Sequence, residues 1–272
     1  MTRNLFFLLI LLPLSGQADV SIVTSIKPLH QLTKIIMQGA GDPKLLIKRQ
    51  ISPHEFAFKP SHFRLLQNAD LVIWIDRQFE SSFQQLPQIL RAGVTQLELL
   101  PRLGLQQQDG HIWYSPVLLI RMTRLIRDAL SKVDPKNSEI YLLNARHLTE
   151  ALQTWRTKFK PEIEAAKPRY ILDHDFLSHF ENDMGIVSIA VLHDTYDQSA
   201  GIRALQIVEE KLEQLSNVCL LTNEATASKL ARNLAEKFSL KIYTIDQSYA
   251  ARENMPTIIQ ALDQLREVLT NC

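Results

Sequence analysis

Apolar and polar residues follow one another along the chain in blocks that predict strands and helices in turn. Short continuous apolar runs are typical of strands buried on both faces of a parallel sheet, and the segments between them have helical spacing. In the first half, this pattern predicts strands at 20–26, 45–47, 71–75 and 94–99, with helices at 28–36, 61–68 and 79–91. The order predicts an α/β fold with helices on both faces of a mainly parallel sheet.

The pattern changes between Asn137 and Ala166. This stretch has no strand signal and no glycine, and its only helix breaker is Pro161. Apolar residues recur there at roughly helical spacing: Ile140, Leu143, Leu148, Leu152, Trp155 and Phe159. The helix would be roughly 40 Å long at about 1.5 Å per residue, which is too long for an ordinary crossover between strands. We therefore expect it to connect two lobes.

The alternation of strands and helices resumes after Pro168. Strands are predicted at 170–172, 186–192, 218–221 and 242–245, and helices at 176–184, 202–215, 225–238 and from about residue 255. The predicted fold is α/β, with two Rossmann-like lobes that have mainly parallel sheets and are joined by one long helix. We expect the first lobe at 19–135, the linking helix at 136–166 and the second lobe at 167–272.

The first 18 residues have the pattern of a cleavable signal peptide. Arg3 precedes an apolar run from Leu5 to Leu14, and small residues follow at Gly16 and Ala18. The run is too short to span a bilayer as a helix. We expect export to the periplasm, with a mature chain that begins near Asp19, and no lipid anchor because no cysteine follows the run.

The net charge indicates which partners to expect, and the cysteine count indicates whether the chain has a disulfide. The formal net charge is +1 and no dense basic cluster is present, so nucleic acid is not an expected partner. The two cysteines are Cys219 and Cys272. An even count in an oxidising compartment favours a disulfide, although a buried Cys219 with a free Cys272 is an alternative.

Three of the eight histidines occupy loops where an α/β protein binds ligands. His54 and His111 lie in loops of the first lobe, and His174 directly follows a predicted strand of the second. Ligands of open α/β sheets bind at the carboxyl ends of strands, so the three imidazoles would meet between the lobes. Asp246 follows the strand at 242–245 and could add an oxygen ligand.

Three imidazoles and one carboxylate would suit tetrahedral zinc. The chain has no HExxH, CxxC or HxH motif, so spacing alone leaves open that the three histidines form separate hydrogen bonds. The other five histidines have ordinary explanations. His30, His62, His147 and His179 lie in predicted helices, and His193 lies beside Asp194 in a polar loop.

Several segments together carry a resemblance to a known family. They are Ser25-Ile26-Lys27-Pro28-Leu29, Ser52-Pro53-His54-Glu55-Phe56, Lys59-Pro60-Ser61, Leu66-Gln67-Asn68-Ala69-Asp70-Leu71-Val72, His111-Ile112-Trp113-Tyr114-Ser115-Pro116, His174-Asp175 with Phe180, and Asn223-Glu224 before a helix with Leu230-Ala231. With these segments the chain resembles the ZnuA-type periplasmic zinc-binding proteins of ABC transporters, a metal-binding cluster of solute-binding proteins. The resemblance extends over essentially the whole mature chain.

The resemblance implies a function and a set of ligands. The matching histidines of that family bind the metal, which implies His54, His111 and His174 as ligands, with Asp246 as the carboxylate that often completes the site. It also implies a rigid linking helix and a disulfide between Cys219 and Cys272. The expected cargo is Zn²⁺, delivered to a cognate ABC permease of the inner membrane by a monomer that is not an enzyme.

This sequence departs from the family pattern at several positions. The His- and acid-rich loop expected between Leu100 and His111 is absent, and Asp246 is followed by Gln-Ser-Tyr in place of Pro-Leu-Gly. Gly110 stands where proline commonly precedes the histidine, and His179 stands where an aromatic residue is common. These departures indicate a divergent member.

Other functions fit part of the same pattern. A binder of manganese, iron or another divalent metal would use the same fold, although a histidine at position 174 favours zinc over the harder manganese. An exported zinc hydrolase would use the same histidines with Glu55 or Asp175 as general base. A metal-independent adhesion or interaction module is the third alternative.

Overall fold

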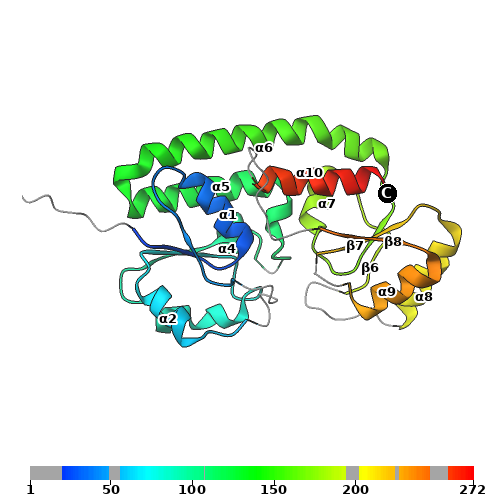
Figure 1. The fold of residues 1–272 in the computed structure, drawn as a ribbon, viewed down its shortest axis with the longest axis horizontal. Coiled ribbons are helices and arrows are strands. Elements are labelled where there is room, and N and C mark those ends of the chain that lie inside the picture. Colours follow the sequence, from blue (N-terminus) through cyan, green and yellow to red (C-terminus); the bar gives the residue numbers. More distant parts are fainter. Residues whose placement is uncertain (1–19, 49–55, 107, 194–201, 224–226, 246–256) are drawn as a thin grey trace, which may run out of the picture.

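The protein has two parallel sheets that lie side by side beneath one long helix (Figure 1). The structure, a computed structural model, describes residues 20–48, 56–106, 108–193, 202–223, 227–245 and 257–272. The signal peptide predicted at 1–18 and the loops with His54 and Asp246 lie outside these residues. Within them, no helix is long and apolar enough to cross a membrane.

The first sheet has four parallel strands in the order β2-β1-β3-β4. The strands are β1 (Ile22–Thr24), β2 (Lys44–Leu45), β3 (Leu71–Trp74) and β4 (Thr95–Glu98). The two central strands, β1 and β3, pair from Ile22 with Leu71 to Thr24 with Ile73, and all of their residues are buried. Their continuous apolar sequences therefore form the centre of the first lobe, as the pattern predicts.

Helices cover this sheet, and several of them have a proline at their first or second residue. They are α1 (Lys27–Ile36), α2 (Pro60–Gln67), α3 (Leu86–Ile89), α4 (Leu99–Leu103) and α5 (Pro116–Val133), with short 3₁₀ segments η2 (Ser81–Gln85), η3 (Ile112–Tyr114) and η4 (Pro135–Asn137). Proline in the first turn costs nothing, because the backbone N–H that it lacks would have no partner within the helix. The Ser115 hydroxyl also caps α5 by accepting from the backbone N–H of Leu118.

The second sheet repeats the strand order of the first, as β6-β5-β7-β8. Its strands are β5 (Tyr170–Leu172), β6 (Ala190–Val191), β7 (Cys219–Thr222) and β8 (Lys241–Thr244). The helices that follow them are α7 (Ser178–Met184), α8 (Ile202–Gln214), α9 (Lys229–Phe238) and α10 (Thr257–Thr270). The strand predicted at 186–192 is only two residues long in the structure, where β6 pairs with β5 alone.

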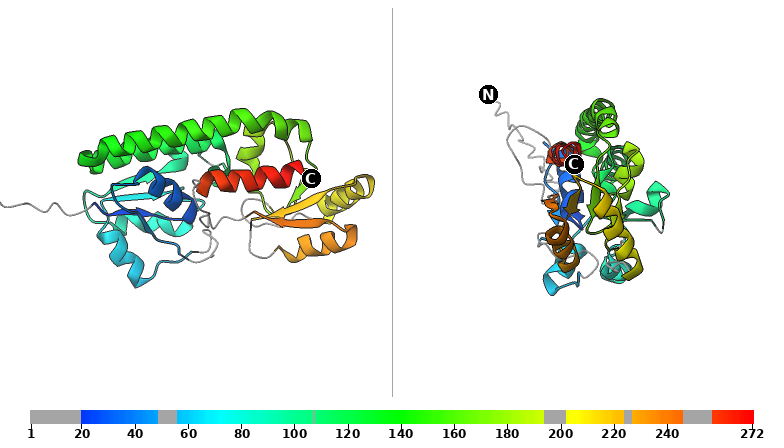
Figure 2. Two further views of the ribbon diagram at one scale, coloured as in Figure 1. Left: turned by 45° about the horizontal axis from the view of Figure 1, so that its top comes forward. Right: turned by 90° about the vertical axis from the view of Figure 1, so that its right-hand side faces the viewer.

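Helix α6 (Ser138–Ala166) extends over both lobes, as Figures 1 and 2 show. It contacts α1 and α5 of the first lobe and α10 near the chain end. Its buried face includes Tyr141, Leu148 and Leu152, and the Trp155 indole N–H donates to Asp263 of α10 at 2.8 Å. The long helix predicted from the sequence is therefore present, while the division into domains stays a prediction.

A buried carboxylate, Asp183 at the end of α7, links three helices. It accepts from the Ser115 hydroxyl and the Val117 N–H at the start of α5, both at 3.0 Å, and from the Arg156 Nε of α6 at 2.6 Å. Lys160 of α6 also donates to the Asp183 carbonyl at 2.6 Å. We call this set of contacts the Asp183 junction. It connects the second lobe to the first lobe and to the long helix.

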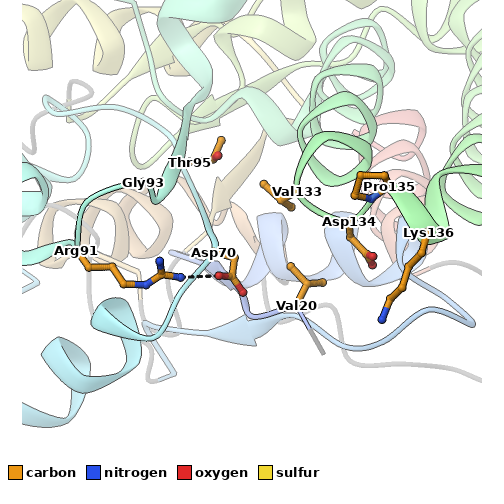
Figure 3. A pocket seen from close by; sticks show the side chains of 9 residues that line it. All are labelled: Val20, Asp70, Arg91, Gly93, Thr95, Val133, Asp134, Pro135 and Lys136. Atoms are coloured by element: carbon orange, nitrogen blue, oxygen red, sulfur yellow. Dashed lines mark hydrogen bonds and ion pairs between the residues drawn. The ribbon is translucent and has the colours of Figure 1, made fainter. Parts of the chain in front are cut away.

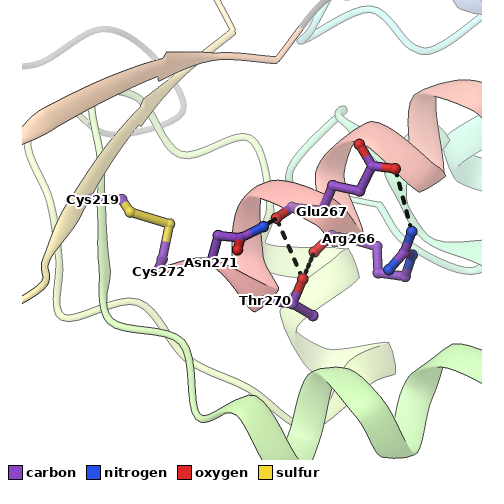
Figure 4. Close-up of a disulfide and its surroundings, with 6 residues drawn as sticks. All are labelled: Cys219, Arg266, Glu267, Thr270, Asn271 and Cys272. Carbon is purple, nitrogen blue, oxygen red and sulfur yellow. Dashed lines mark hydrogen bonds and ion pairs between the residues drawn. A yellow bond between two sulfur atoms is a disulfide. The ribbon is translucent and has the colours of Figure 1, made fainter.

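The two cysteines connect the chain end to the second sheet. Cys219 of β7 and Cys272 form a disulfide with a Cα–Cα distance of 5.6 Å (Figure 4). Since β7 is a central strand of its sheet, the bond holds the end of α10 close to the core of the second lobe.

Candidate metal site

Two of the four predicted ligands, His111 and His174, meet where the lobes face each other. His111 directly precedes η3, and His174 follows the carboxyl end of β5. Their ring centroids are 5.1 Å apart, with the planes 75° to each other. Both are buried, at 4% and 8% exposed. His54 and Asp246 lie outside the described residues, so the complete ligand set remains a proposal.

The ring of His111 is enclosed by aromatic side chains. Phe79, which follows β3, packs edge-on against it with centroids 5.0 Å apart, and Trp113 lies at 5.1 Å. This packing leaves the imidazole little freedom to rotate. The sheet of the first lobe thus fixes His111 through the segment that follows β3.

Asp109 holds the same imidazole by hydrogen bonds. Its Oδ1 lies 2.7 Å from His111 Nδ1 and also accepts from the His111 backbone N–H at 3.1 Å. Asp109 is also bonded to α7 of the second lobe: its Oδ2 accepts from the Ser178 hydroxyl at 3.1 Å. Its carbonyl oxygen lies 2.7 Å from His179 Nε2, which must be the donor because a carbonyl only accepts.

The pKa values of two acids near His111, Asp109 and Asp175, are shifted in opposite directions. Burial, together with the charges of Asp109 and Glu181, raises the pKa of Asp175 to about 6. Burial also acts to raise the pKa of Asp109, but the charge and hydrogen bonds of His111 outweigh it and lower that pKa. Asp109 is therefore the ionised acceptor beside His111.

Three histidines outside the predicted ligand set form ordinary hydrogen bonds, and a fourth is an exception. His30 lies 3.4 Å from the Thr24 hydroxyl, His62 accepts from the Lys59 N–H, and His193 donates to the Asp173 carbonyl. The exception is His179, for which the sequence indicates no role beyond its place in a predicted helix but which contacts the carbonyl of Asp109 beside His111. Asp109, only two residues before His111, could have been suspected from the sequence. Ser178 and His179 had no such signal.

The described residues contain two of the four predicted metal ligands, His111 and His174. Within them, no group of three or more His, Cys, Asp or Glu side chains is arranged to hold a metal ion. The other two predicted ligands, His54 and Asp246, lie outside the described ranges, so the ligand set stays a prediction. The two imidazoles that are described supply the borderline nitrogen donors that zinc accepts.

A separate pocket of about 500 Å³ lies at the opposite edge of the first sheet (Figure 3). Val20 and Asp70 precede β1 and β3, Thr95 begins β4, and Arg91 forms an ion pair with Asp70 at 2.5 Å. The pocket is therefore at the amino ends of the strands, and none of the predicted ligands lines it.

Comparison with known proteins identifies the family. The model of the family described as "Zinc-uptake complex component A periplasmic" (ZnuA) matches residues 22–272. The chain belongs to the ZnuA family. Its relatives include the high-affinity zinc uptake system protein ZnuA of Brucella abortus, 21% identical over 95% of this chain and 93% of the relative. The ZnuA of Haemophilus ducreyi is 22% identical over 99% of this chain and all of the relative.

Solved structures share the fold of this ZnuA-family chain. AdcAII of Streptococcus pneumoniae superposes with a TM-score of 0.80 at 20% identity, over 94% of this chain and 99% of that one. The laminin-binding protein Lmb of Streptococcus agalactiae, described as an adhesin with metal-transporting activity, also gives 0.80 at 20% identity, over 92% and 98%. These likenesses confirm the predicted fold class of two α/β lobes joined by a long helix.

Proposed function

We propose that the protein is a periplasmic solute-binding protein that captures Zn²⁺ between its lobes and delivers it to a cognate ABC permease of the inner membrane. The ligands in this proposal are His54, His111, His174 and Asp246. The observation that carries it is the contact between His111 and His174, two buried imidazoles from different lobes. Membership of the ZnuA family and the names of the zinc uptake relatives support it.

The spacing of the two rings fits a shared zinc ion. With Zn–N bonds of about 2.0–2.1 Å and tetrahedral angles, two imidazoles on one ion have ring centroids about 5 Å apart. The observed separation of 5.1 Å agrees with this value. Binding requires neutral imidazoles, so zinc affinity measured by titration should fall below about pH 6.

The ligand set is tested by single substitutions in untagged mature protein. His54→Ala, His111→Ala and His174→Ala should each weaken zinc binding by orders of magnitude in competition with a chelator. His147→Ala, in α6 and away from the lobe contact, is the control and should leave the affinity nearly unchanged. Equal, small effects of all four substitutions would rule out the proposed site.

Asp246 is the ligand whose sequence context departs most from the family. Its carboxylate would stabilise the dication, but three imidazoles and a water can also complete a tetrahedral zinc site. Asp246→Ala should therefore weaken zinc binding less than His174→Ala does, with one ion still bound per chain. Calorimetry that shows wild-type affinity for Asp246→Ala would exclude Asp246 as a ligand.

Under this proposal the protein is not an enzyme, because the capture and release of an ion need no chemistry on a substrate. Hydrolase assays of the zinc-loaded protein should show no turnover, whereas the zinc hydrolase alternative requires it. Competition between metals should favour zinc over manganese, because His174 supplies nitrogen where a manganese site would prefer oxygen. We further expect a monomer, which light scattering would check.

A further inference from the structure

We propose that Asp109 is a positioning residue for zinc capture, which presents Nε2 of His111 to the ion and makes that orientation dependent on α7 of the second lobe. The inference rests on the proposed function and adds to it a residue that does not itself bind the metal. It follows from the contacts of one buried carboxylate with both lobes.

The first step concerns the tautomer of His111. Its Nδ1 lies 2.7 Å from Asp109 Oδ1, and the two side chains are only 5% and 6% exposed. An ionised carboxylate can only accept, so in neutral His111 the proton is on Nδ1 and the lone pair is on Nε2. Metal-bound histidines commonly have this arrangement, in which the second ring nitrogen donates to a carboxylate that fixes the tautomer and ring orientation.

The second step concerns the direction of the ring. A flip of the His111 ring, which exchanges its nitrogen and carbon positions, would break the hydrogen bond to Asp109. Phe79 and Trp113 pack against two sides of the imidazole and oppose that rotation. The hydrogen bond thus selects one orientation among those that the aromatic packing allows. In this orientation the ring of His111 contacts that of His174.

The third step concerns the second lobe. Ser178 donates to Asp109 Oδ2 at 3.1 Å, while Oδ1 is used by His111, so both carboxylate oxygens have fixed partners. His179 donates to the carbonyl of the same residue at 2.7 Å. Ser178 and His179 begin α7, only four and five residues after His174. Asp109 therefore aligns the two imidazoles before an ion arrives, and this preorganisation lowers the cost of binding.

The test uses Asp109→Ala, with Asp134→Asn as a matched control. Asp134 is also a buried carboxylate of the first lobe, bonded to Tyr141 and Asn137 and situated beside the pocket at the opposite edge of the sheet. Long-range ¹⁵N–¹H spectra of the metal-free proteins report the tautomer of His111, and chelator competition reports the zinc affinity. A purely structural role for Asp109 would not change the tautomer.

We expect wild type and Asp134→Asn to show the Nδ1–H tautomer of His111 and the same zinc affinity. Asp109→Ala should show a mixture of tautomers and bind zinc about 10–100-fold more weakly. If Asp109→Ala does not fold, Ser178→Ala removes one partner of the carboxylate and should weaken zinc binding several-fold.

The experiment distinguishes failure of this inference from failure of the proposed function. If the Asp109→Ala protein, or the Ser178→Ala protein used in its place, keeps wild-type affinity while His111→Ala loses zinc, the inference is wrong and the proposed function stands. An unchanged tautomer in Asp109→Ala would also overturn it. If the wild-type protein binds no zinc, the proposed function fails and the role of Asp109 in capture fails with it.

Discussion

Glu80 is a fully buried acid in the first lobe, close to the carboxyl ends of β1 and β3. Its Oε2 accepts from the Ile75 N–H at 2.7 Å, and its side chain lies beside Ser25. Burial is the main cause that raises the pKa of Glu80 to about 8. At neutral pH the folded protein therefore keeps this carboxyl group protonated, whereas the unfolded chain ionises it.

This difference predicts how stability depends on pH. Because the folded pKa is above the unfolded one, the contribution of Glu80 is fully present below about pH 4.5 and is lost as the pH rises through about 8. Within that window, this group should lower the free energy of unfolding by up to about 1.4 kcal/mol per pH unit. Urea unfolding at several pH values should show a smaller slope for Glu80→Gln.

The exposed Glu150, which pairs with Arg146 at the surface of α6, offers the control. Glu150→Gln should leave the slope between pH 5 and 8 as in wild type. A wild-type slope in Glu80→Gln as well would mean that Glu80 is ionised at neutral pH.

Single residues also show how far the site could be predicted from the sequence. His111 and His174 were recognisable as candidate ligands because His111 lies in a loop before a helix and His174 follows a strand, in the loops where α/β proteins bind ligands. Asp109 meets Ser178 and His179 across 69 and 70 residues of sequence, and no local pattern indicates such contacts. The roles of His54 and Asp246 stay predictions.

Among the elements, the buried strands were predictable and the segment after β3 was not. Strands β3 and β7 are almost entirely apolar because both of their faces are covered. The helix predicted at 79–91 is instead η2 followed by α3. Asp76 accepts from the N–H groups of Gln78 and Phe79, and Glu80 bonds back to Ile75. These side-chain bonds to the backbone make a turn that apolar spacing cannot reveal.

The turn that follows β3 places Phe79 against residue 110 and so explains why that residue is a glycine. A Cβ added at Gly110 would lie 2.2 Å from Cδ2 of Phe79, the ring that packs against His111. Gly110→Ala must therefore displace Phe79, and we expect it to lower the free energy of unfolding by about 1–3 kcal/mol. In a Phe79→Ala background the same substitution should cost at least about 1 kcal/mol less.

Urea unfolding of the four proteins in this double-mutant cycle measures the coupling between the two positions. Additive effects of Gly110→Ala and Phe79→Ala would show that the ring does not exclude a side chain at position 110. The proline that is common at this position in the ZnuA family would clash with the same Phe79 ring here. The glycine at position 110, which departs from the family pattern, and the aromatic ring of Phe79 are therefore linked in this chain.

At the scale of the whole molecule, the disulfide joins the chain end to the core of the second lobe. Its half-cystines are 53 residues apart, and closing a loop of this length stabilises a fold by about 4 kcal/mol on the chain-entropy model. Denatured mature protein should contain no titratable thiol, and reduction should lower its melting temperature. Two thiols in freshly exported protein would contradict the bond. Cys272→Ser should melt at the same temperature with and without reductant.

The Asp183 junction restricts how far the second lobe can move relative to the first lobe and α6. A swing of the second lobe about α6 would have to separate the start of α5 from Asp183, together with the Arg156 contact. Breaking hydrogen bonds to a buried charge costs about 1.5–3 kcal/mol each. Small-angle X-ray scattering should therefore give the same radius of gyration with and without zinc, and a larger one for zinc-free Asp183→Ala. Under the proposed function, the junction therefore predicts that the ion is released without a change in the distance between the lobes.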